Sequence, residues 1–347
     1  MDRFIGLDAH LSSCTLAVVG PSGKRLRSEV IETSAGALAR AVRRVRGTRH
    51  LCFEEGTMSE WLHEVLSPHV HELVVVGLQK KKRGPKNDRI DAFDLANKLR
   101  LGDIEQSIFK GYGPFKRLRE LSRVYQKVND DVVRVKNRLK SLYRSRGIAT
   151  SGKDIYRSAQ RQDWLKKLPQ ELLSAARLLH TEQELLESLK KEAQKELIEE
   201  SHRHTISRIL ETVPGIGAVR VAQAMAIVVT PYRFRTKRQF WSYSGLGIVM
   251  RSSSDYVQEG GRWIRAPVMV TRGLNLRSNH DLKRIFKGAA TTVSSQLPHS
   301  PLGQSYTTQL ANGTKPNLAK LTLARKIAAI FLSIWKKKEE YDPERYR

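Results

Sequence analysis

The hydrophobic pattern of roughly the first 110 residues constrains the fold more than any other feature of this sequence. Short apolar runs with strand periodicity alternate with longer runs that have helical periodicity. Strands are predicted at residues 4–7, 14–20, 27–31, 51–54 and 72–78, and helices at 35–45, 61–66 and 89–101. The first three strands follow one another through short polar turns, and the later strands alternate with helices. This order predicts a mixed sheet covered by helices.

A helical zone follows, and its apolar residues recur at alternating spacings of three and four. They are Leu118, Leu121, Tyr125, Val128, Val132, Val135, Leu139 and Leu142. This is the heptad pattern of a coiled coil. A second helical run, at about residues 170–200, carries apolar residues on one face. The two runs are compatible with an antiparallel hairpin or with a coiled coil between chains. Their role is either that of a structural spacer or that of a dimerisation arm.

The third zone, from about residue 204, is mostly helical and rich in turn glycines, and it ends in an amphipathic helix at residues 318–338. The three zones predict an α/β domain at residues 1–110, a helical or coiled-coil region at 111–203 and a mostly helical domain at 204–347. The predicted fold class is therefore α/β plus α.

The charge balance points to a polyanionic partner. The chain has 62 Lys and Arg residues against 35 Asp and Glu residues, which gives a formal net charge of +27. Such an excess repels itself unless a polyanion compensates it, and nucleic acid is the commonest polyanion in a cell. A basic protein that binds anionic surfaces without specificity is the simpler alternative.

Composition also argues against several classes of protein. The two cysteines, Cys14 and Cys52, lie in apolar strand-like runs, so we expect buried, inert thiols and no zinc cluster. No apolar run approaches the length of about 18 residues that a membrane span needs. We expect no signal peptide, because the sequence opens on a strand-like run. Together these features predict a cytoplasmic protein.

Five acidic residues lie where elements of the first zone end or begin. Asp8 ends the opening strand, Glu54 and Glu55 end a later strand, and Asp88 and Asp91 begin the last helix. A spacing of three puts Asp88 and Asp91 on one helical face. Converging carboxylates can hold two hard divalent cations, which would activate a nucleophile and stabilise the leaving oxygen of a phosphodiester. A plain helix N-cap is the alternative for Asp88.

Three further motifs have a possible chemical role. A cationic loop contains Lys80, Lys81, Lys82, Arg83 and Lys86. Its charges suit contact with a phosphate backbone, and the simpler alternative is a solvated surface loop. A V-P-G-I-G turn with Gly215 and Gly217 resembles the helix-hairpin-helix, whose backbone N–H groups contact DNA phosphates. The simpler alternative is an ordinary turn between two helices. A polar stretch with Ser252, Ser253 and Ser254 offers hydroxyl nucleophiles, although such clusters are usually loops.

Taken in order, these motifs resemble the DEDD transposases of the insertion-sequence one-ten group, the Piv/MooV-like recombinases. The resemblance covers nearly the whole chain. It is carried by G-L-D-A-H, E-G-T followed by Trp61, K-N-D-R-I-D-A-F-D-L-A, V-P-G-I-G, F-W-S-Y-S-G-L and L-A-R-K-I-A-A-I. The resemblance implies a RuvC-like, ribonuclease-H-type fold for the first domain. It implies a C-terminal transposase domain for the third, with the helix-hairpin-helix-like turn.

The resemblance also assigns roles to individual residues. It makes Asp8, Glu55, Asp88 and Asp91 a metal-binding tetrad that would hold Mg²⁺, as two ions. Glu55 is preferred to Glu54 because Thr57 and Trp61 then fall at the family's offsets.

The nucleophile implied by the resemblance is Ser253, counted eight residues beyond Gly245. The S-S-S-D context departs from the family's usual S-G, so Ser252 and Ser254 stay alternatives. The implied reaction is strand exchange through a covalent phosphoserine intermediate. The acids and the serine would meet in a composite site between protomers of a homodimer or homotetramer.

The implied partners are double-stranded donor and target DNA and a noncoding bridge RNA that selects sequences by base pairing. Three alternatives stay open. One is a RuvC-like nuclease or junction resolvase that activates water, and another is a site-specific DNA invertase of the same family. The third is a non-catalytic scaffold that binds nucleic acid. The target and donor sequences do not follow from the protein sequence.

Overall fold

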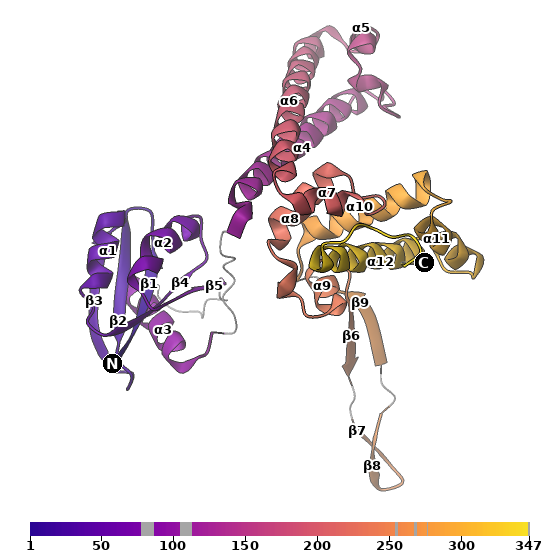
Figure 1. The fold of residues 1–347 in the computed structure, drawn as a ribbon. Coiled ribbons are helices and arrows are strands. Elements are labelled where there is room, and N and C mark those ends of the chain that lie inside the picture. Colours follow the sequence, from indigo (N-terminus) through magenta and orange to yellow (C-terminus); the bar gives the residue numbers. More distant parts are fainter. Residues whose placement is uncertain (78–86, 105–112, 254–255, 267–268, 276, 346–347) are drawn as a thin grey trace. The chain divides into compact units, whose positions relative to one another are not determined.

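The computed structural model describes residues 1–77, 87–104, 113–253, 256–266, 269–275 and 277–345 (Figure 1), with the backbone alone at 250–253 and 269–272. The chain divides into two compact units, Met1–Gly111 and Tyr112–Arg347. None of the described helices combines the length and apolar character that crossing a membrane requires.

The first unit is built on a five-stranded mixed sheet. Its elements are β1 (Asp2–Ala9), β2 (Ser13–Val19), β3 (Arg25–Glu32), α1 (Ala35–Arg43), β4 (Thr48–Glu54), α2 (Ser59–Leu66), β5 (Glu72–Val76) and α3 (Asp88–Leu101). The strand order is β3-β2-β1-β4-β5, in which β2 is antiparallel to β1 and β3, and β4 is parallel to β1 and β5. The strands, helices and mixed sheet predicted for this zone are confirmed.

Alternating side chains divide the residues of this sheet between its two faces. One face packs against α1 and α2 in a core that includes Ile5, Leu7, Leu16, Leu51 and Phe53. The other face packs against α3, where the buried residues include Ala17, Val19, Cys52, Ala92, Leu95 and Ala96. Both cysteines are buried and free, as expected, and burial raises the pKa of Cys52 to about 12.

Gly6 allows the backbone of α3 to lie directly on β1. A Cβ atom at Gly6 would collide with the carbonyl oxygen of Ala92 and would lie 2.7 Å from the backbone nitrogen of Ala96. Glycine in a strand commonly marks such a close backbone approach. Because Ala92 and Ala96 add only small side chains, helix and strand meet without a spacer, and the start of α3 is held near the end of β1.

The second unit begins with two long helices, α4 (Lys116–Arg144) and α6 (Gln170–His202), which pack against each other (Figure 1). Ion pairs between Lys136 and Glu187 and between Arg138 and Glu182 join them, and Arg146, just beyond the end of α4, pairs with Glu171 of α6. Residue numbers rise along α4 as they fall along α6, so the helices are antiparallel. Of the two arrangements left open above, the hairpin within one chain is observed, and a coiled coil between chains stays a prediction.

The heptad positions of α4 face inward as predicted. Leu118, Tyr125, Val132, Val135 and Leu139 are buried, and the other predicted positions are half-buried. At the far end of the hairpin, Leu139 and Tyr143 of α4 join Ala176 of α6 in a small core. Trp164 of the short helix α5 (Arg161–Leu165) completes this core. The connection between the two long helices is therefore packed against them.

The rest of the second unit is mostly helical, as predicted. Its helices are α7 (Thr205–Glu211), α8 (Ala218–Val228), α9 (Lys237–Tyr243), α10 (His280–Gln296), α11 (Pro301–Ala311) and α12 (Pro316–Lys337), and its strands are β6 (Ile248–Ser253), β7 (Tyr256–Glu259), β8 (Arg262–Arg265) and β9 (Met269–Leu274). The strands form two antiparallel pairs, β6 with β9 and β7 with β8. The helix predicted at residues 318–338 is α12, whose Phe331 packs against Phe286 of α10.

Candidate metal centre

Two carboxylates and an imidazole converge in the first unit. The Nε2 atom of His10 lies 3.3 Å from a carboxylate oxygen of Asp8 and 3.7 Å from one of Asp88. One possible ligand atom from each of the three residues lies within 4.8 Å of the others. Asp8 is on β1, His10 directly follows that strand, and Asp88 is in the first turn of α3. The predicted meeting of Asp8 with Asp88 is therefore present.

The close contact between β1 and α3 explains this meeting. Gly6 and Asp8 are two residues apart in the strand and share the face that α3 covers. In α3, Asp88 precedes Ala92 and Ala96 at intervals of four, so the three residues follow one side of the helix. Since Ala92 and Ala96 rest on Gly6, Asp88 is directed towards the end of β1, where Asp8 lies.

The start of α3 corrects one of the alternatives considered for Asp88. The N-cap residue is Asn87, whose side-chain oxygen accepts a hydrogen bond of 3.0 Å from the backbone N–H of Arg89. The N-cap explanation of Asp88 is therefore wrong, because Asn87 already fills that role. Asp88 and Asp91 both lie in the first turn, where the helix dipole favours negative charge.

The electrostatics of the site favour a bound cation. Burial raises the pKa of Asp8 above its usual value, and the charges of Asp88 and Asp91 raise it further, while His10 lowers it. The charge of Asp91 thus acts on Asp8, and the place of Asp91 in the tetrad stays a prediction. A divalent cation would relieve the repulsion among these carboxylates.

The glutamates at the end of β4 lie on the neighbouring strand. Leu7 of β1 pairs with Phe53 of β4, so the next position of β4, Glu54, lies beside Asp8. Strand alternation gives Glu54 the same face as the buried Cys52, which is the face that α3 covers. Glu55 follows the strand, is exposed, and donates its backbone N–H to the carbonyl of Val76 at 2.7 Å. Among the described residues, neither glutamate joins the group of Asp8, His10 and Asp88.

His10 is the residue of this group that sequence reasoning missed. It stands two positions after Asp8 in D-A-H, which is the period of a strand, and this spacing was the available signal. The carboxylate oxygens of the group suit hard cations such as Mg²⁺ and Mn²⁺, and the imidazole adds a nitrogen that transition metals accept. The donor set therefore fits a divalent cation.

The remaining predicted site residues belong to other segments of the chain. The cationic loop of Lys80, Lys81, Lys82, Arg83 and Lys86 falls outside the described residues, and so does Ser254. Ser252 and Ser253 belong to β6, where their backbones pair with Val270 and Met269 of β9. Both lie in a strand, whereas serine clusters of this kind are usually loops.

The V-P-G-I-G motif forms the turn between α7 and α8. Gly215 has a φ angle of +80°, and a Cβ atom there would lie 2.6 Å from the carbonyl oxygen of Ala289 in α10. Its own carbonyl accepts a hydrogen bond of 2.7 Å from Arg220. Conformation and packing thus explain this glycine. Gly217, by contrast, is exposed and forms the N-cap of α8.

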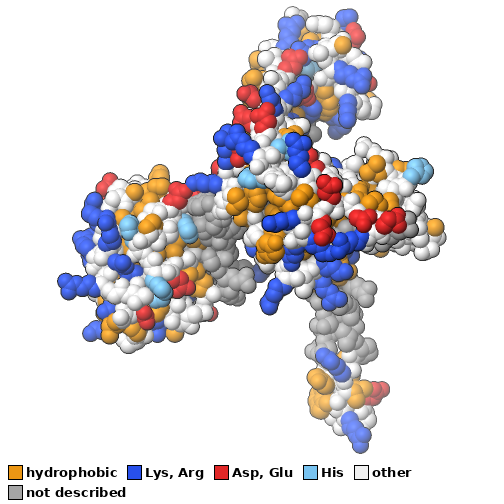
Figure 2. Space-filling model, viewed as in Figure 1, with side chains coloured by type: hydrophobic (Ala, Val, Ile, Leu, Met, Phe, Trp, Pro, Cys, Tyr) orange, Lys and Arg blue, Asp and Glu red, His pale blue; other side chains and the backbone are white. Residues whose placement is uncertain are grey.

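Lys and Arg side chains are spread over the visible surface of both units (Figure 2). This distribution agrees with the formal net charge of +27. Basic surface extends well beyond the candidate metal centre, as expected for a protein that neutralises a long polyanion.

Comparison with protein families identifies the chain. A transposase model of the DEDD IS110 type matches residues 5–145, and a model described as transposase IS116/IS110/IS902 family matches residues 207–297. No curated protein matches the chain significantly. The first match agrees with the ribonuclease-H-like mixed sheet, and its DEDD domain implies a divalent metal and DNA as a partner. Together the matches span more than half of the sequence, and the chain belongs to the IS110 family of transposases.

Proposed function

We propose that this transposase cleaves and joins DNA strands at a divalent-metal centre made by Asp8, Asp88, Asp91 and a glutamate from the end of β4. The observation that carries this proposal is the convergence of Asp8, His10 and Asp88 where β1 ends and α3 begins. Mg²⁺, as two ions, would supply charge stabilisation at the attacked phosphate. The carboxylates hold the cations, and His10 contacts two of those carboxylates.

The glutamate of the tetrad is Glu54 or Glu55. The family offsets of Thr57 and Trp61 favour Glu55, whereas the position of Glu54 on the α3 face of β4 favours Glu54. Replacing each in turn by Gln tests the choice, because the metal ligand is the one whose loss abolishes cleavage. Asp94→Asn is the matched control, since Asp94 is exposed in the same helix as Asp88 and Asp91.

The nucleophile is Ser253, with Ser252 and Ser254 as alternatives. Its hydroxyl oxygen forms a bond to the scissile phosphorus as the bond from phosphorus to the leaving strand's oxygen breaks. The serine proton passes to a base, and the leaving oxygen takes up a proton. The phosphoserine stores the energy of the broken bond until a second strand attacks it and releases the serine.

The proposed partners are donor and target DNA together with a noncoding bridge RNA. The formal net charge of +27 supports a complex that must neutralise more than one polyanion. In the proposed domain order, residues 1–110 form the metal-binding domain and residues 204–347 the serine-bearing domain. The α4–α6 hairpin makes up most of the region at residues 111–203 that connects them in sequence. The acids and serine meet between protomers of a homodimer or homotetramer.

The test is covalent capture of cleaved DNA on the protein in Mg²⁺, with the attached residue assigned by mass spectrometry. We expect the adduct on Ser253, its loss in Ser253→Ala and Asp8→Asn, and its retention in Asp94→Asn. Continued cleavage by Ser253→Ala without an adduct would instead indicate a nuclease or resolvase that activates water. No metal-dependent cleavage by the wild-type protein would contradict the proposal.

A further inference from the structure

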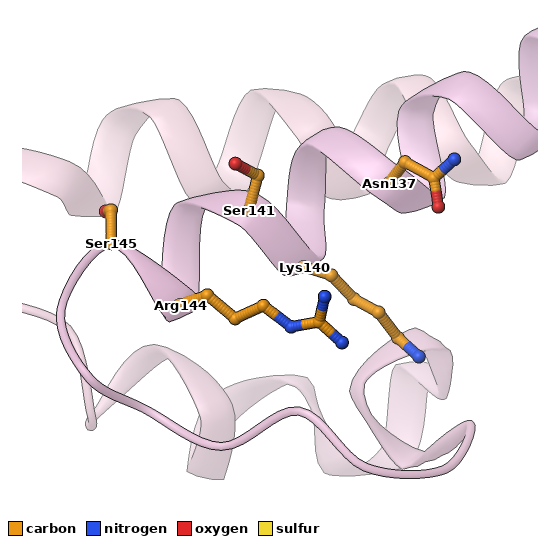
Figure 3. Close-up of a pocket in the computed structure, with 5 residues that line it drawn as sticks. All are labelled: Asn137, Lys140, Ser141, Arg144 and Ser145. Atoms are coloured by element: carbon orange, nitrogen blue, oxygen red, sulfur yellow. The ribbon is translucent and has the colours of Figure 1, made fainter.

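A polar groove opens near the far end of the α4–α6 hairpin, in the second unit. It has a volume of about 580 Å³ and is lined by Asn137, Lys140, Ser141, Arg144 and Ser145 (Figure 3). All five belong to the C-terminal end of α4 or to its cap, and most of them are exposed. The groove is therefore open to solvent and lined by polar side chains.

The chain that follows α4 forms the opposite side of this region. It turns back beneath the helix, where Lys140 donates a hydrogen bond of 3.1 Å to the carbonyl of Gly152. Arg144 donates one of 2.9 Å to the hydroxyl of Thr150, which is buried. Figure 3 shows the side chains of Lys140 and Arg144 next to each other above this returning segment. The two cations are thus held in position by the fold.

The two cations differ from their neighbours in how their charge is compensated. Other cations of this helical region pair with carboxylates: Arg134 with Asp131, Lys136 with Glu187, Arg138 with Glu182 and Arg146 with Glu171. In the part of the chain that the structure describes, the partners recorded for Lys140 and Arg144 are neutral oxygens. The groove therefore holds two positive charges that no described carboxylate balances.

An aromatic ring supports the same pair. The Lys140 ammonium lies 5.3 Å from the centroid of the Tyr156 ring, a cation–π distance. Burial raises the pKa of Tyr156, and the charge of Arg144 opposes this rise, so both cations lie close to this residue. The Tyr156 hydroxyl in turn donates to the backbone carbonyl of Lys136 at 3.4 Å. The returning segment and the helix are therefore tied together around the cations.

We propose that this groove binds phosphodiester groups of a nucleic-acid backbone. An ammonium has three N–H donors and a guanidinium has five, and the bonds recorded for Lys140 and Arg144 use one donor of each. The remaining donors, with the side chains of Asn137, Ser141 and Ser145, suit the charged oxygens of a phosphate. None of the five lining residues is aromatic, so the groove suits the backbone better than a stacked base.

This inference rests on the proposed function, because it names a surface by which the recombinase would hold its DNA or its RNA. The test compares the full-length wild-type protein with the double variant Lys140→Gln/Arg144→Gln. Binding of a labelled DNA duplex and of a labelled hairpin RNA, both of arbitrary sequence, is titrated at several salt concentrations. Each lost phosphate contact should weaken binding roughly five-fold at ~0.15 M salt and lower the salt dependence by about one counterion.

A matched control separates location from net charge. Arg123→Gln/Arg134→Gln removes two positive charges from α4 that pair with Glu120 and Asp131. A second variant, Ser141→Glu, places a carboxylate in the groove while keeping the side chains that hold the returning segment. It should weaken binding as the double variant does, even where Lys140→Gln/Arg144→Gln loosens the hairpin. Circular dichroism melts report whether each variant is folded.

The outcomes are distinct. A loss of affinity larger than the control's supports the proposed groove. The loss can appear with DNA alone, with RNA alone or with both, and this shows which nucleic acid has its backbone bound in the groove. Wild-type affinity and salt dependence in Ser141→Glu, or a loss no greater than the control's in the double variant, overturns it. Metal-dependent cleavage by the wild-type protein is measured separately. Its absence would defeat the proposed function while leaving the binding results to decide on the groove.

Discussion

At the scale of single residues, Gly6 sets the distance between the sheet and the helix that carries two of the acids. Gly6→Ala would push a methyl group into the backbone of α3 at Ala92 and Ala96. We expect it to destabilise the protein by about 1–3 kcal/mol, the usual cost of overpacking, and to weaken Mg²⁺ binding because Asp88 moves with α3. Denaturant unfolding and metal titration measure the two effects.

Gly20→Ala is the control for this substitution. A Cβ at Gly20 would make only ordinary contacts, the nearest at 3.6 Å from Leu26. It should leave stability and metal binding close to those of the wild-type protein. Equal effects of the two substitutions would show that the close approach of α3 to β1 does not shape the site.

A second residue-scale prediction concerns Asp8. Burial raises its pKa, and so do the charges of Asp88 and Asp91, so its ionised form costs stability at neutral pH in the absence of a cation. We expect Asp8→Asn to raise the thermal midpoint in EDTA, while Mg²⁺ raises the midpoint of the wild-type protein and not that of the variant. Thermal melts with and without Mg²⁺ measure this. An equal response of both proteins to Mg²⁺ would place the cation elsewhere.

At the scale of secondary-structure elements, the sequence predicted the first unit well because its strands and helices have distinct periods. The strands β1 to β5 carry alternating or continuous apolar runs, and polar turns separate them. The heptads of α4 predicted an inward face equally well. They did not distinguish a hairpin from a coiled coil between chains, because both bury the same seam. The ion pairs to α6 show the hairpin within one chain, and they depend on tertiary structure, which the heptads do not encode.

The candidate site was less predictable than the elements that carry it. The sequence identified Asp8 and Asp88 because Asp8 lies near the end of a strand and Asp88 begins a helix. It missed His10, because only the packing of α3 against β1 brings Asp88 to that imidazole. The choice between Glu54 and Glu55 was ambiguous for a related reason. Strand alternation ends at the last residue of β4, and only the observed register shows which glutamate lies beside Asp8.

His180 of α6 gives a prediction for the hairpin as an element. Its side chain is 1% exposed, and its Nε2 atom has no hydrogen-bond partner among the described residues. Burial lowers its pKa below the usual 6.5, and the charge of Arg161 lowers it further. The unfolded chain takes up a proton on His180 near the ordinary pKa of histidine, whereas the folded hairpin takes it up only at a lower pH. The contribution of neutral His180 to stability is therefore present above the ordinary pKa and is lost as the pH falls below it.

We expect the thermal midpoint of the wild-type protein to fall between pH 7 and pH 5, and His180→Phe to reduce this fall. Melts followed by circular dichroism across that range measure it. His280→Phe, at the exposed start of α10, controls for the replacement of a histidine. The same pH dependence in His180→Phe and the wild-type protein would show that this imidazole is not the group that titrates.

At the scale of the whole molecule, the acids and the serines belong to different units of the chain. Asp8, Asp88 and Asp91 are in Met1–Gly111, and the serine strand β6 is in Tyr112–Arg347. A reaction that needs both requires the two units to act on one phosphate. The proposed composite site draws the acids from one protomer and the serine from another. This arrangement makes catalysis depend on assembly, because a lone chain would lack a complete site.

Mixing two inactive variants tests that dependence. Asp8→Asn lacks a metal ligand, and Ser253→Ala lacks the nucleophile, so each alone should form no covalent DNA adduct. In a dimer with sites shared between protomers, a mixed pair contains one intact site, made from the acids of one chain and the serine of the other. Random mixing makes half of the dimers mixed, so adduct formation should recover to about a quarter of the wild-type level. Sites confined to single chains would give no recovery, because every chain in the mixture carries one lesion. Combining both substitutions in one chain provides the control, since mixing it with either single variant cannot restore a site.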